Sequence, residues 1–480
     1  MFISPSELKE LNRNKVSVVI VGAGPAGITI AMELETLGID SLLIEAGGFD
    51  FPDEYGNDPY RGVVGARPYA LAASRLRFYG GTSNHWGGWC RPLDREDFKK
   101  VDDVPLSGWP IDYDEAYQYL DKAHVVCEVN GRDYDASRIE EIKPDTVVPF
   151  TADSPFRTSI FRFSPPTRFG SRYRDRVSNS KKIHCILNSN LIKVKRVEGG
   201  KSSLLVKLAT KEIVEIKSKA YVLAMGGIEN ARFLLSSNQD ISVPYGGDWV
   251  GRCFMEHFGF KTSVVYAKSG LDYRRRKASK GDVRAVISTA PSQIKKGLPN
   301  IMMGLFPIAD DQFLGKDYSK NKGLFDFSQK NGWHYELRTT VANRPNKNSY
   351  ISLADEKDVH GVNRINLNWQ ISDEDFRSVI KCSDMFGLYI AAKGYGRLKK
   401  TNHVVPKPDK MLSTGMHHIG TTRIASTEST GVVDENCKVF YSDDLFVAGS
   451  SIFPTTGYSN PTLTIVALAI RLAKHVAKDV

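Results

Sequence analysis

A glycine-rich turn near the start of the chain limits the fold more than any other feature. Its pattern is Gly-x-Gly-x-x-Gly, and it stands between a β-branched run of strand length and an apolar run with helical spacing. A second short strand and an acidic residue follow. In chain order the segments are Val16–Val21, Gly22–Gly27, Ile28–Gly38, Ser41–Ile44 and Glu45. This order of strand, turn, helix, strand and acid predicts a dinucleotide-binding βαβ unit.

Each residue of the turn has a physical role in such a unit. Gly22 permits the tight turn, Gly24 lets a pyrophosphate approach the backbone, and Gly27 lets the helix pack closely on the strand. The N-terminus of the helix then faces the phosphate charge. Glu45 stands 23 positions after Gly22, close to the spacing of about 20 residues at which an acid hydrogen-bonds ribose hydroxyls.

The arrangement of the other strands favours FAD over NAD. Buried apolar runs suited to one parallel sheet occur in three separated stretches, at residues 16–44, 183–224 and 445–449. An NAD domain is usually contiguous, whereas insertions that bind substrate often interrupt a flavin domain. Further runs between turn residues predict a large antiparallel sheet. These runs are Phe260–Tyr266, Arg284–Ser288, Asn300–Phe306, His334–Val341, Ser349–Leu353 and Arg364–Asn368.

We therefore predict an α/β protein with two parts. The first is a doubly wound, Rossmann-like FAD domain, and the second is an inserted α+β substrate domain on an antiparallel sheet. The FAD domain would comprise residues 1–106, 180–258 and 410–480. The substrate domain would comprise residues 107–179 and 259–409.

Composition excludes several other classes of protein. The chain has 480 residues, of which 41% are hydrophobic and 25% charged, so it is neither disordered nor collagen-like. The apolar run Leu463–Ile470 is far shorter than the roughly 20 residues of a membrane span, and residues 1–15 lack the apolar core of a signal peptide. Six cysteines without a Cys-x-x-Cys pair predict no metal site and no disulfide framework. They favour a cytoplasmic location.

Two clusters carry candidate chemistry. The first, Gly80–Trp89, contains four glycines, two tryptophans and His85. Its glycines permit close backbone approach, and its tryptophans offer flat apolar walls. The second cluster is split between Met416–Arg423 and Pro454–Thr462, and the latter runs directly into a predicted terminal helix.

Taken together, these motifs resemble the glucose–methanol–choline (GMC) oxidoreductases, flavoproteins that oxidise alcohols to carbonyls. The resemblance covers nearly the whole chain. Within the family, the chain most resembles the pyranose oxidase branch and its bacterial sugar-oxidising relatives. The most specific features are the His-x-x-Gly-Thr-x-Arg run at His417–Arg423 and the Gly-Tyr-x-Asn-Pro-Thr-Leu-Thr run at Gly457–Thr464.

The resemblance implies a catalytic pair. His417 falls at the position of the family's catalytic base, and Asn460 falls at the position of its partner. A neutral imidazole is suited to take the hydroxyl proton near pH 7 while hydride passes to flavin N5. Asn460 would hold the same hydroxyl by a hydrogen bond. The helix that follows Pro461 would point its positive end at the flavin.

The resemblance also implies contacts to FAD. The residues expected to make them, beyond those of the first turn, are Gly81, Thr82, Asn84, His85, Gly449, Asn460, Pro461 and Thr462. In pyranose oxidases, a histidine at the place of His85 is covalently joined to the flavin. Here Gly87 and Gly88 depart from that branch, so covalent and non-covalent FAD both stay open. His257 resembles a recurrent family element, for which we favour a structural role.

The expected substrate is a secondary alcohol, a ring hydroxyl of a sugar, glycoside or cyclitol, oxidised to a ketone. The electron acceptor is oxygen or another compound. A net charge of +10 and the basic cluster Arg274–Lys277 leave open a flavoprotein that modifies a nucleic acid or a carrier-linked sugar. A sterol-type oxidase of related fold, which would require a deep apolar cavity, is a further alternative. No aromatic residues interleave with this cluster, so we expect no nucleic-acid partner. Substrate identity and oligomeric state stay open.

Overall fold

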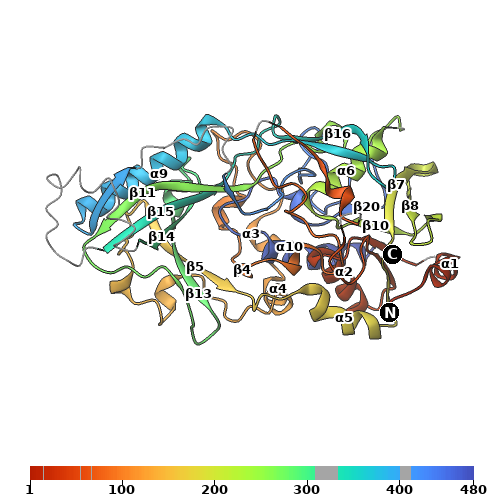
Figure 1. Ribbon diagram of the computed structural model, residues 1–480, viewed down its shortest axis with the longest axis horizontal. Coiled ribbons are helices and arrows are strands. Elements are labelled where there is room, and N and C mark those ends of the chain that lie inside the picture. Colours follow the sequence, from red (N-terminus) through yellow and green to blue (C-terminus); the bar gives the residue numbers. More distant parts are fainter. Residues whose placement is uncertain (14–15, 54–55, 66, 240, 309–332, 401–411) are drawn as a thin grey trace.

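The computed structural model describes residues 1–13, 16–53, 56–65, 67–239, 241–308, 333–400 and 412–480. A five-stranded sheet of parallel strands, in the order β20-β10-β1-β2-β6, lies at the end of the molecule that holds both termini (Figure 1). Its strands are β1 (Val18–Val21), β2 (Ser41–Ile44), β6 (Ile183–Ile186), β10 (Ala220–Leu223) and β20 (Leu445–Val447). Three separated stretches of sequence thus build one sheet, as predicted for an interrupted flavin domain.

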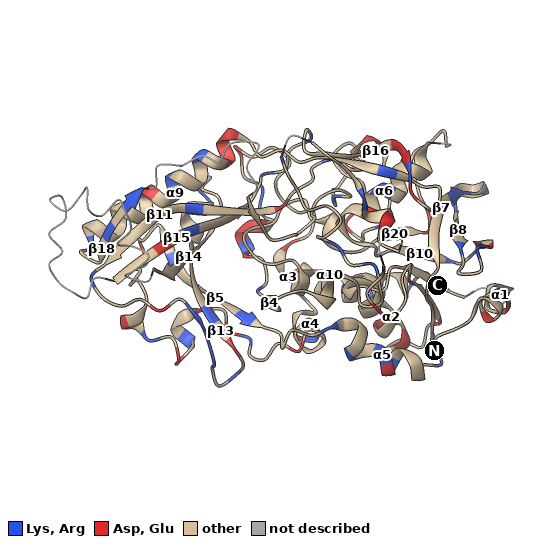
Figure 2. Cartoon of the chain, viewed as in Figure 1, with Lys and Arg blue, Asp and Glu red and all other residues tan. Residues whose placement is uncertain are grey.

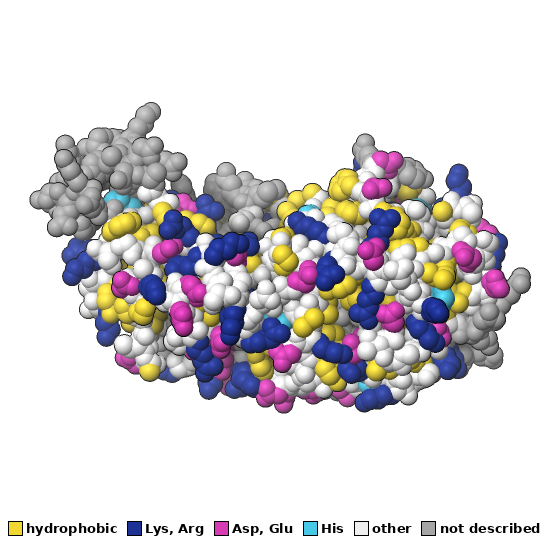
Figure 3. Space-filling model, turned by 90° about the horizontal axis from the view of Figure 1, so that it is seen from below, with side chains coloured by type: hydrophobic (Ala, Val, Ile, Leu, Met, Phe, Trp, Pro, Cys, Tyr) yellow, Lys and Arg dark blue, Asp and Glu magenta, His cyan; other side chains and the backbone are white. Residues whose placement is uncertain are grey.

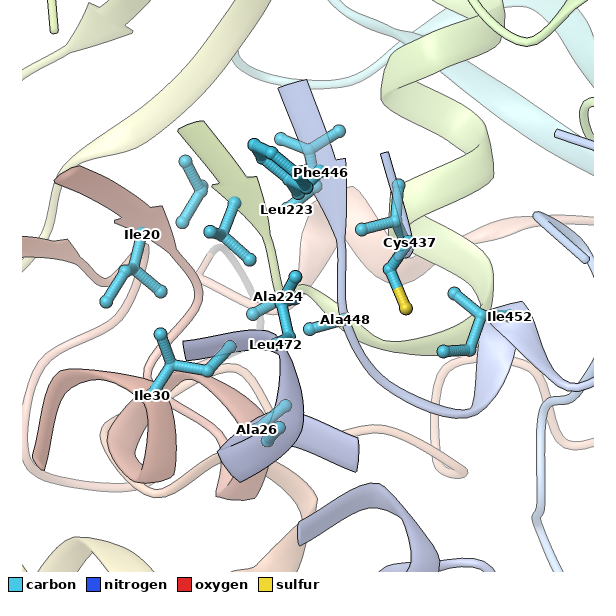
Figure 4. Packing of buried hydrophobic residues seen from close by; sticks show 14 of the residues in the cluster. Ile20, Ala26, Ile30, Leu223, Ala224, Cys437, Phe446, Ala448, Ile452 and Leu472 are labelled. Atoms are coloured by element: carbon cyan, nitrogen blue, oxygen red, sulfur yellow. The ribbon is translucent and has the colours of Figure 1, made fainter. Parts of the chain in front are cut away.

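Helices cover this sheet. Every residue of β1, β2 and β10 is buried, as expected for parallel strands packed on both faces. Helix α2 (Pro25–Thr36) follows the glycine turn and packs against the C-terminal helix α10 (Thr462–Val476). Figure 4 shows side chains of the strands, such as Ile20 and Leu223, in one cluster with Ile30 of α2 and Leu472 of α10.

A nine-stranded antiparallel sheet builds the opposite end of the molecule (Figure 1). Its main path is β18-β11-β15-β14-β13-β5-β4, while β12 pairs with β13 and β19 with β11. The strands are β4 (Trp89–Cys90), β5 (Phe156–Phe163), β11 (His257–Ala267), β12 (Arg275–Arg276), β13 (Val283–Thr289), β14 (Met302–Pro307), β15 (Trp333–Ala342), β18 (Gly396–Lys400) and β19 (Ser413–Thr414). Helix α9 (Asp373–Ala392) packs on this sheet, where Phe376 meets Phe258 edge to face. The predicted antiparallel sheet is therefore present.

Two predicted strands belong to a different sheet. The runs expected at 349–353 and 364–368 form the hairpin β16 (Tyr350–Lys357) and β17 (Asn363–Asn368). Strand β17 then takes β3 (Gly62–Val64) as a parallel partner. A local pattern reveals a strand but not a partner 300 residues away, which explains the difference. Strands β7 (Asn190–Arg196), β8 (Ser202–Lys207) and β9 (Ile213–Ile216) form a separate antiparallel meander.

Six other α-helices lie within the described residues. They are α1 (Pro5–Arg13), α3 (Tyr113–Ala116), α4 (Leu120–Val126), α5 (Phe169–Asn179), α6 (Gly226–Asn238) and α7 (Pro291–Ile294). Within the described ranges, no helix combines the length and the apolar character needed to cross a membrane. All six cysteines are buried and are free thiols, not in disulfides. Part of the predicted boundary near residue 410 falls in 401–411, outside the described residues, and the division into two domains stays a prediction.

Opposite charges are interspersed over the molecule (Figures 2 and 3). Acidic residues also lie beside the basic cluster Arg274–Lys277. Arg274 pairs with Asp272 at 2.9 Å, and Asp282 pairs with Arg275 at 2.8 Å and with Lys277 at 3.0 Å. Two neighbouring carboxylates, Asp272 and Asp282, therefore offset about half of the positive charge of this cluster, which weakens the argument for a nucleic acid or an anionic carrier there.

Candidate active site

A cavity of about 470 Å³ opens at the carboxyl ends of the parallel strands. The glycine turn after β1 lines it, together with Glu45 after β2 and Gly449 after β20. Ligands of open α/β sheets bind in this place because loops from neighbouring strands diverge there. The loop after Gly80 and the two parts of the C-terminal cluster complete the wall.

The glycine turn is shaped to receive a group from the cavity. Gly22 has φ +104°, and a Cβ there would lie 2.6 Å from the carbonyl oxygen of Ala224. A Cβ on Gly27 would lie 1.9 Å from the carbonyl oxygen of Gly22, so this glycine is needed for helix packing. A Cβ on Gly24 would meet no atom within 4 Å. Gly24 therefore presents open space, where a pyrophosphate fits beside the N-terminus of α2.

Glu45 stabilises the glycine turn through hydrogen bonds to backbone N–H groups. One carboxylate oxygen accepts the N–H of Ala23 and the other accepts the N–H of Gly47, each at 2.9 Å. The side chain is buried, which raises the pKa of its carboxyl group. Each oxygen keeps a second lone pair, so a ribose contact is compatible with this role. The sequence suggested only the ribose contact, not the support of the loop.

The second glycine loop brings three of its four predicted cofactor residues to the cavity. Gly81, Thr82 and His85 line it. Asn84 does not belong to the lining, and its Nδ2 donates to the carbonyl of Tyr79 at 3.0 Å, which holds the loop. Burial, and secondarily the charge of Arg168, lowers the pKa of His85.

The predicted catalytic pair meets at the cavity wall. His417 and Asn460 are 43 positions apart in sequence, yet Asn460 Nδ2 lies 3.2 Å from His417 Nε2. Both residues line the cavity, as do Pro461 and Thr462 at the start of α10. The N-terminal turn of α10 thus carries its positive end to this wall.

A buried carboxylate fixes the backbone that carries His417. Both oxygens of Glu256 lie within hydrogen-bond distance of the N–H of His417, at 2.8 and 2.9 Å. The same carboxylate accepts the N–H of His257 at 2.7 Å and the hydroxyl of Tyr69 at 2.5 Å. Burial raises the pKa of Glu256 to about 7. Strand β19 pairs with β11 just before His417, and this pairing brings the two segments together.

His418, the neighbour of His417, is held within the wall. Its Nε2 lies 3.0 Å from the hydroxyl of Ser74, and its ring packs edge-on against Tyr69. Burial lowers its pKa to about 3, so the ring is neutral at pH 7. Of the two neighbouring histidines, His417 is therefore the one that contacts Asn460.

Several charged or polar residues of the cavity were not predicted as site residues from the sequence. Arg75, Arg77, Glu229, Arg232, Asp358 and His360 all contribute to the lining. Arg232 bridges Glu229 at 3.0 Å and Asp358 at 2.5 Å. Arg77 contacts Asn190, which also lines the cavity. Such residues lie in no common motif, so only the folded chain brings them together.

Gly415 allows a test of the position of His417. A Cβ at residue 415 would lie 2.5 Å from Nδ1 of His417, so Gly415→Ala must displace the ring. A shift of about 1 Å at a reacting group costs up to about 100-fold in rate. We expect Gly415→Ala to lower the rate of the alcohol oxidation that the family resemblance implies by roughly 10- to 100-fold, at unchanged content of the implied FAD, measured by anaerobic stopped-flow absorbance. Gly65→Ala, where the nearest atom would be at 3.4 Å, is the control; equal rates in both variants would contradict the account.

Two segments of the chain match models of known protein families. Residues 345–469 match the family model described as GMC oxidoreductase, and residues 15–52 match the model described as FAD binding domain. C-glycoside 3-oxidase of Microbacterium trichothecenolyticum is 31% identical over 124 residues, which is 26% of this chain and 23% of that protein. Paromamine 6'-oxidase of Streptomyces fradiae is 25% identical over 178 residues, 35% of this chain and 32% of that protein. The matches thus span less than a third of the length of these two relatives.

Longer matches extend over the whole chain at lower identity. The 2-methyl-1,2-propanediol dehydrogenase of Mycolicibacterium austroafricanum is 21% identical and covers 97% of this chain and 96% of that protein. The crystal structure of pyridoxine 4-oxidase from Mesorbium loti has a TM-score of 0.57 at 17% identity, over 96% of this chain and 99% of that one. At this identity the structural match shows a shared fold.

These findings make the chain a flavoprotein of the α/β class with FAD as its cofactor. Residues 345–469 match the GMC oxidoreductase model and residues 15–52 the FAD-binding model, and the fold is one found in solved oxidases. The predicted family, fold class and cofactor are confirmed. The open face of Gly24 and the first turn of α2 agree with FAD on structural grounds.

Proposed function

We propose that this protein oxidises a secondary alcohol, a ring hydroxyl of a sugar, glycoside or cyclitol, to a ketone. The observation that carries the proposal is the pair formed by His417 Nε2 and Asn460 Nδ2, 3.2 Å apart at the cavity wall. The names of relatives, among them a C-glycoside 3-oxidase and a paromamine 6'-oxidase, favour a sugar over a simple alcohol. Oxygen or another compound is the final electron acceptor.

The two residues have separate tasks. Burial, and secondarily the neighbouring His257, lowers the pKa of His417 well below its usual value, so the ring is neutral at pH 7 and its free nitrogen accepts the hydroxyl proton. Asn460 holds the substrate oxygen in line with that nitrogen. Bound FAD supplies the acceptor for the hydride at its N5 atom.

We further propose that FAD is held by the glycine turn, by Gly81, Thr82 and His85, and by Gly449 with the start of α10 at Pro461 and Thr462. Asn84 acts through the loop that it holds. Acid precipitation tests the state of FAD: a yellow pellet means that the flavin is covalently bound, with His85 as the proposed point of attachment, and a colourless pellet with FAD in the supernatant means that it is not. In either case residues 1–106, 180–258 and 410–480 serve FAD, and residues 107–179 and 259–409 serve the substrate.

Two substitutions in one turn separate FAD binding from folding. Gly24→Val fills the open space that faces the cavity, and we expect it to weaken FAD binding at least about tenfold, or roughly 1.4 kcal/mol, at unchanged stability of the apoprotein. Gly27→Val instead forces a side chain against the carbonyl of Gly22 and should destabilise the apoprotein by roughly 1–3 kcal/mol. Fluorescence titration with FAD and urea unfolding measure the two effects. A Gly24→Val variant with wild-type FAD affinity would contradict this placement of the pyrophosphate.

A panel of sugars, glycosides, cyclitols and simple alcohols tests the substrate class. We expect consumption of a cyclic polyol with formation of one ketone, identified by mass spectrometry after reduction with borodeuteride. Oxidation of simple primary alcohols alone, without any activity on cyclic polyols, would reject the proposed substrate class while leaving the oxidoreductase assignment in place.

A further inference from the structure

A second histidine contacts the proposed base on the side away from the cavity. His257, the first residue of β11, is 2% exposed. Its Nδ1 lies 2.9 Å from Nδ1 of His417, and the two rings stand nearly perpendicular, at 86°. Its Nε2 lies 2.8 Å from the carbonyl oxygen of Gly457. The sequence suggested only a structural role for this residue.

These contacts determine where the protons lie. A backbone carbonyl only accepts hydrogen bonds, so Nε2 of His257 carries a proton and donates it to Gly457. Burial lowers the pKa of His257 to about 4, so the ring is neutral and its Nδ1 is an acceptor. The short contact between the two Nδ1 atoms then requires that Nδ1 of His417 carries a proton and donates it to Nδ1 of His257. A neutral His417 with a proton on Nδ1 has a free lone pair on Nε2.

The position of Asn460 agrees with this assignment independently. Its Nδ2, a donor, lies 3.2 Å from Nε2 of His417, and this nitrogen must therefore accept. Glu256 does not decide the tautomer, because its carboxylate is directed at the backbone N–H groups of His417 and His257 and at Tyr69. The ring of His257 is the group that faces Nδ1 of His417.

We propose that His257 is a positioning residue that holds His417 in the tautomer with an unprotonated Nε2, so that this nitrogen takes the substrate proton. The inference rests on the proposed oxidation of an alcohol. In that reaction the O–H bond breaks and its proton moves to Nε2 of His417, while the C–H bond breaks and its hydrogen and electron pair leave as hydride to bound FAD. The imidazolium formed on His417 keeps its Nδ1–H bond to His257.

Asparagine and glutamine at residue 257 separate the two contacts. The amide oxygen of His257→Asn stands near the place of Nδ1 and accepts from His417. The longer side chain of His257→Gln reaches the place of Nε2 and keeps the contact to Gly457, but offers His417 no acceptor. We expect the Gln variant to reduce its FAD with substrate about 100-fold more slowly than wild type, and the Asn variant to be at least about tenfold faster than the Gln variant. Equal rates of the Asn and Gln variants, at equal FAD content and melting temperature, would overturn the proposal.

A spectroscopic readout tests the tautomer without turnover. In the FAD-loaded protein with ¹⁵N-labelled histidine, the resonances missing from His417→Gln belong to His417, one of ten histidines. We expect its Nε2 in the range of an unprotonated nitrogen in wild type, and a shift towards the protonated range in His257→Gln. A proton on Nε2 in wild type would overturn the inference. So would a stoichiometric metal ion whose removal changes both rings, since Glu256, His257 and His417 offer ligand atoms within 4.8 Å of one another.

The two readouts separate this inference from the function on which it rests. If the resonances show the expected tautomer but no alcohol reduces the flavin, the proposed function fails and the His257–His417 contact stands as a structural feature. If alcohols are oxidised and the tautomer is the other one, the function stands and the role of His257 is wrong.

Discussion

A His417→Gln variant is expected to reduce its bound FAD with the alcohol substrate about 10²- to 10⁴-fold more slowly than wild type, the contribution typical of a general base. Glutamine fills a similar volume but accepts no proton, so nothing takes the hydroxyl proton as hydride leaves. Rapid mixing under anaerobic conditions measures the rate. The FAD content should not change. The side chain of His417 lines the cavity, and Glu256 still holds its backbone N–H in the variant.

The control for this variant is His184→Gln. His184 lies in β6, outside the cavity lining, and its replacement should leave the rate of flavin reduction unchanged. A His417→Gln enzyme that is as fast as the His184→Gln enzyme would remove His417 from the mechanism. Asn460→Ala offers a graded comparison, because it removes the group that orients the substrate but keeps the base.

The largest loss of stability is expected for Arg232→Met. Arg232 is 1% exposed and donates to Glu229 at 3.0 Å, to Asp358 at 2.5 Å and to the carbonyl of Asn363 at 2.7 Å. Without it, the carboxylate of Asp358 stays buried with no opposite charge in direct contact among the described residues. Removing one partner of a buried pair costs about 3–5 kcal/mol, and we expect a loss of this size in urea unfolding of the FAD-loaded protein.

An exposed ion pair gives the matched control. Arg377 lies 3.2 Å from Glu374 on α9, and both side chains are more than half exposed. Arg377→Met should cost less than about 1 kcal/mol, because solvent screens such pairs. A loss below about 1 kcal/mol for Arg232→Met as well would show that the buried network does not stabilise the fold as the contacts imply.

Local features of the chain were predicted well from the sequence. The glycine turn is a contiguous signal, because strand, turn and helix all lie within residues 16–38. The parallel sheet and the antiparallel sheet follow from apolar runs of strand length. The parallel partner of β17 did not follow, because β3 lies about 300 residues earlier and is only three residues long.

The same limit applies to the candidate site. His417 and Asn460 were found because both stand in recognisable runs, and the structure brings them together. The contact between His257 and His417 spans 160 positions, and that between Arg232 and Asp358 spans 126. No residue pattern along the chain encodes such distances. Buried arginines and carboxylates that compensate one another become visible only when the fold places them side by side.

The central claim is that a cyclic alcohol reduces the FAD of this protein. The most direct measurement is an anaerobic titration of the wild-type holoprotein with sugars and cyclitols, in which the flavin absorbance is followed and the product is analysed. We expect complete bleaching by at least one cyclic polyol, with one ketone formed per flavin. Fully loaded protein whose flavin stays oxidised in the presence of every alcohol in the panel would contradict it.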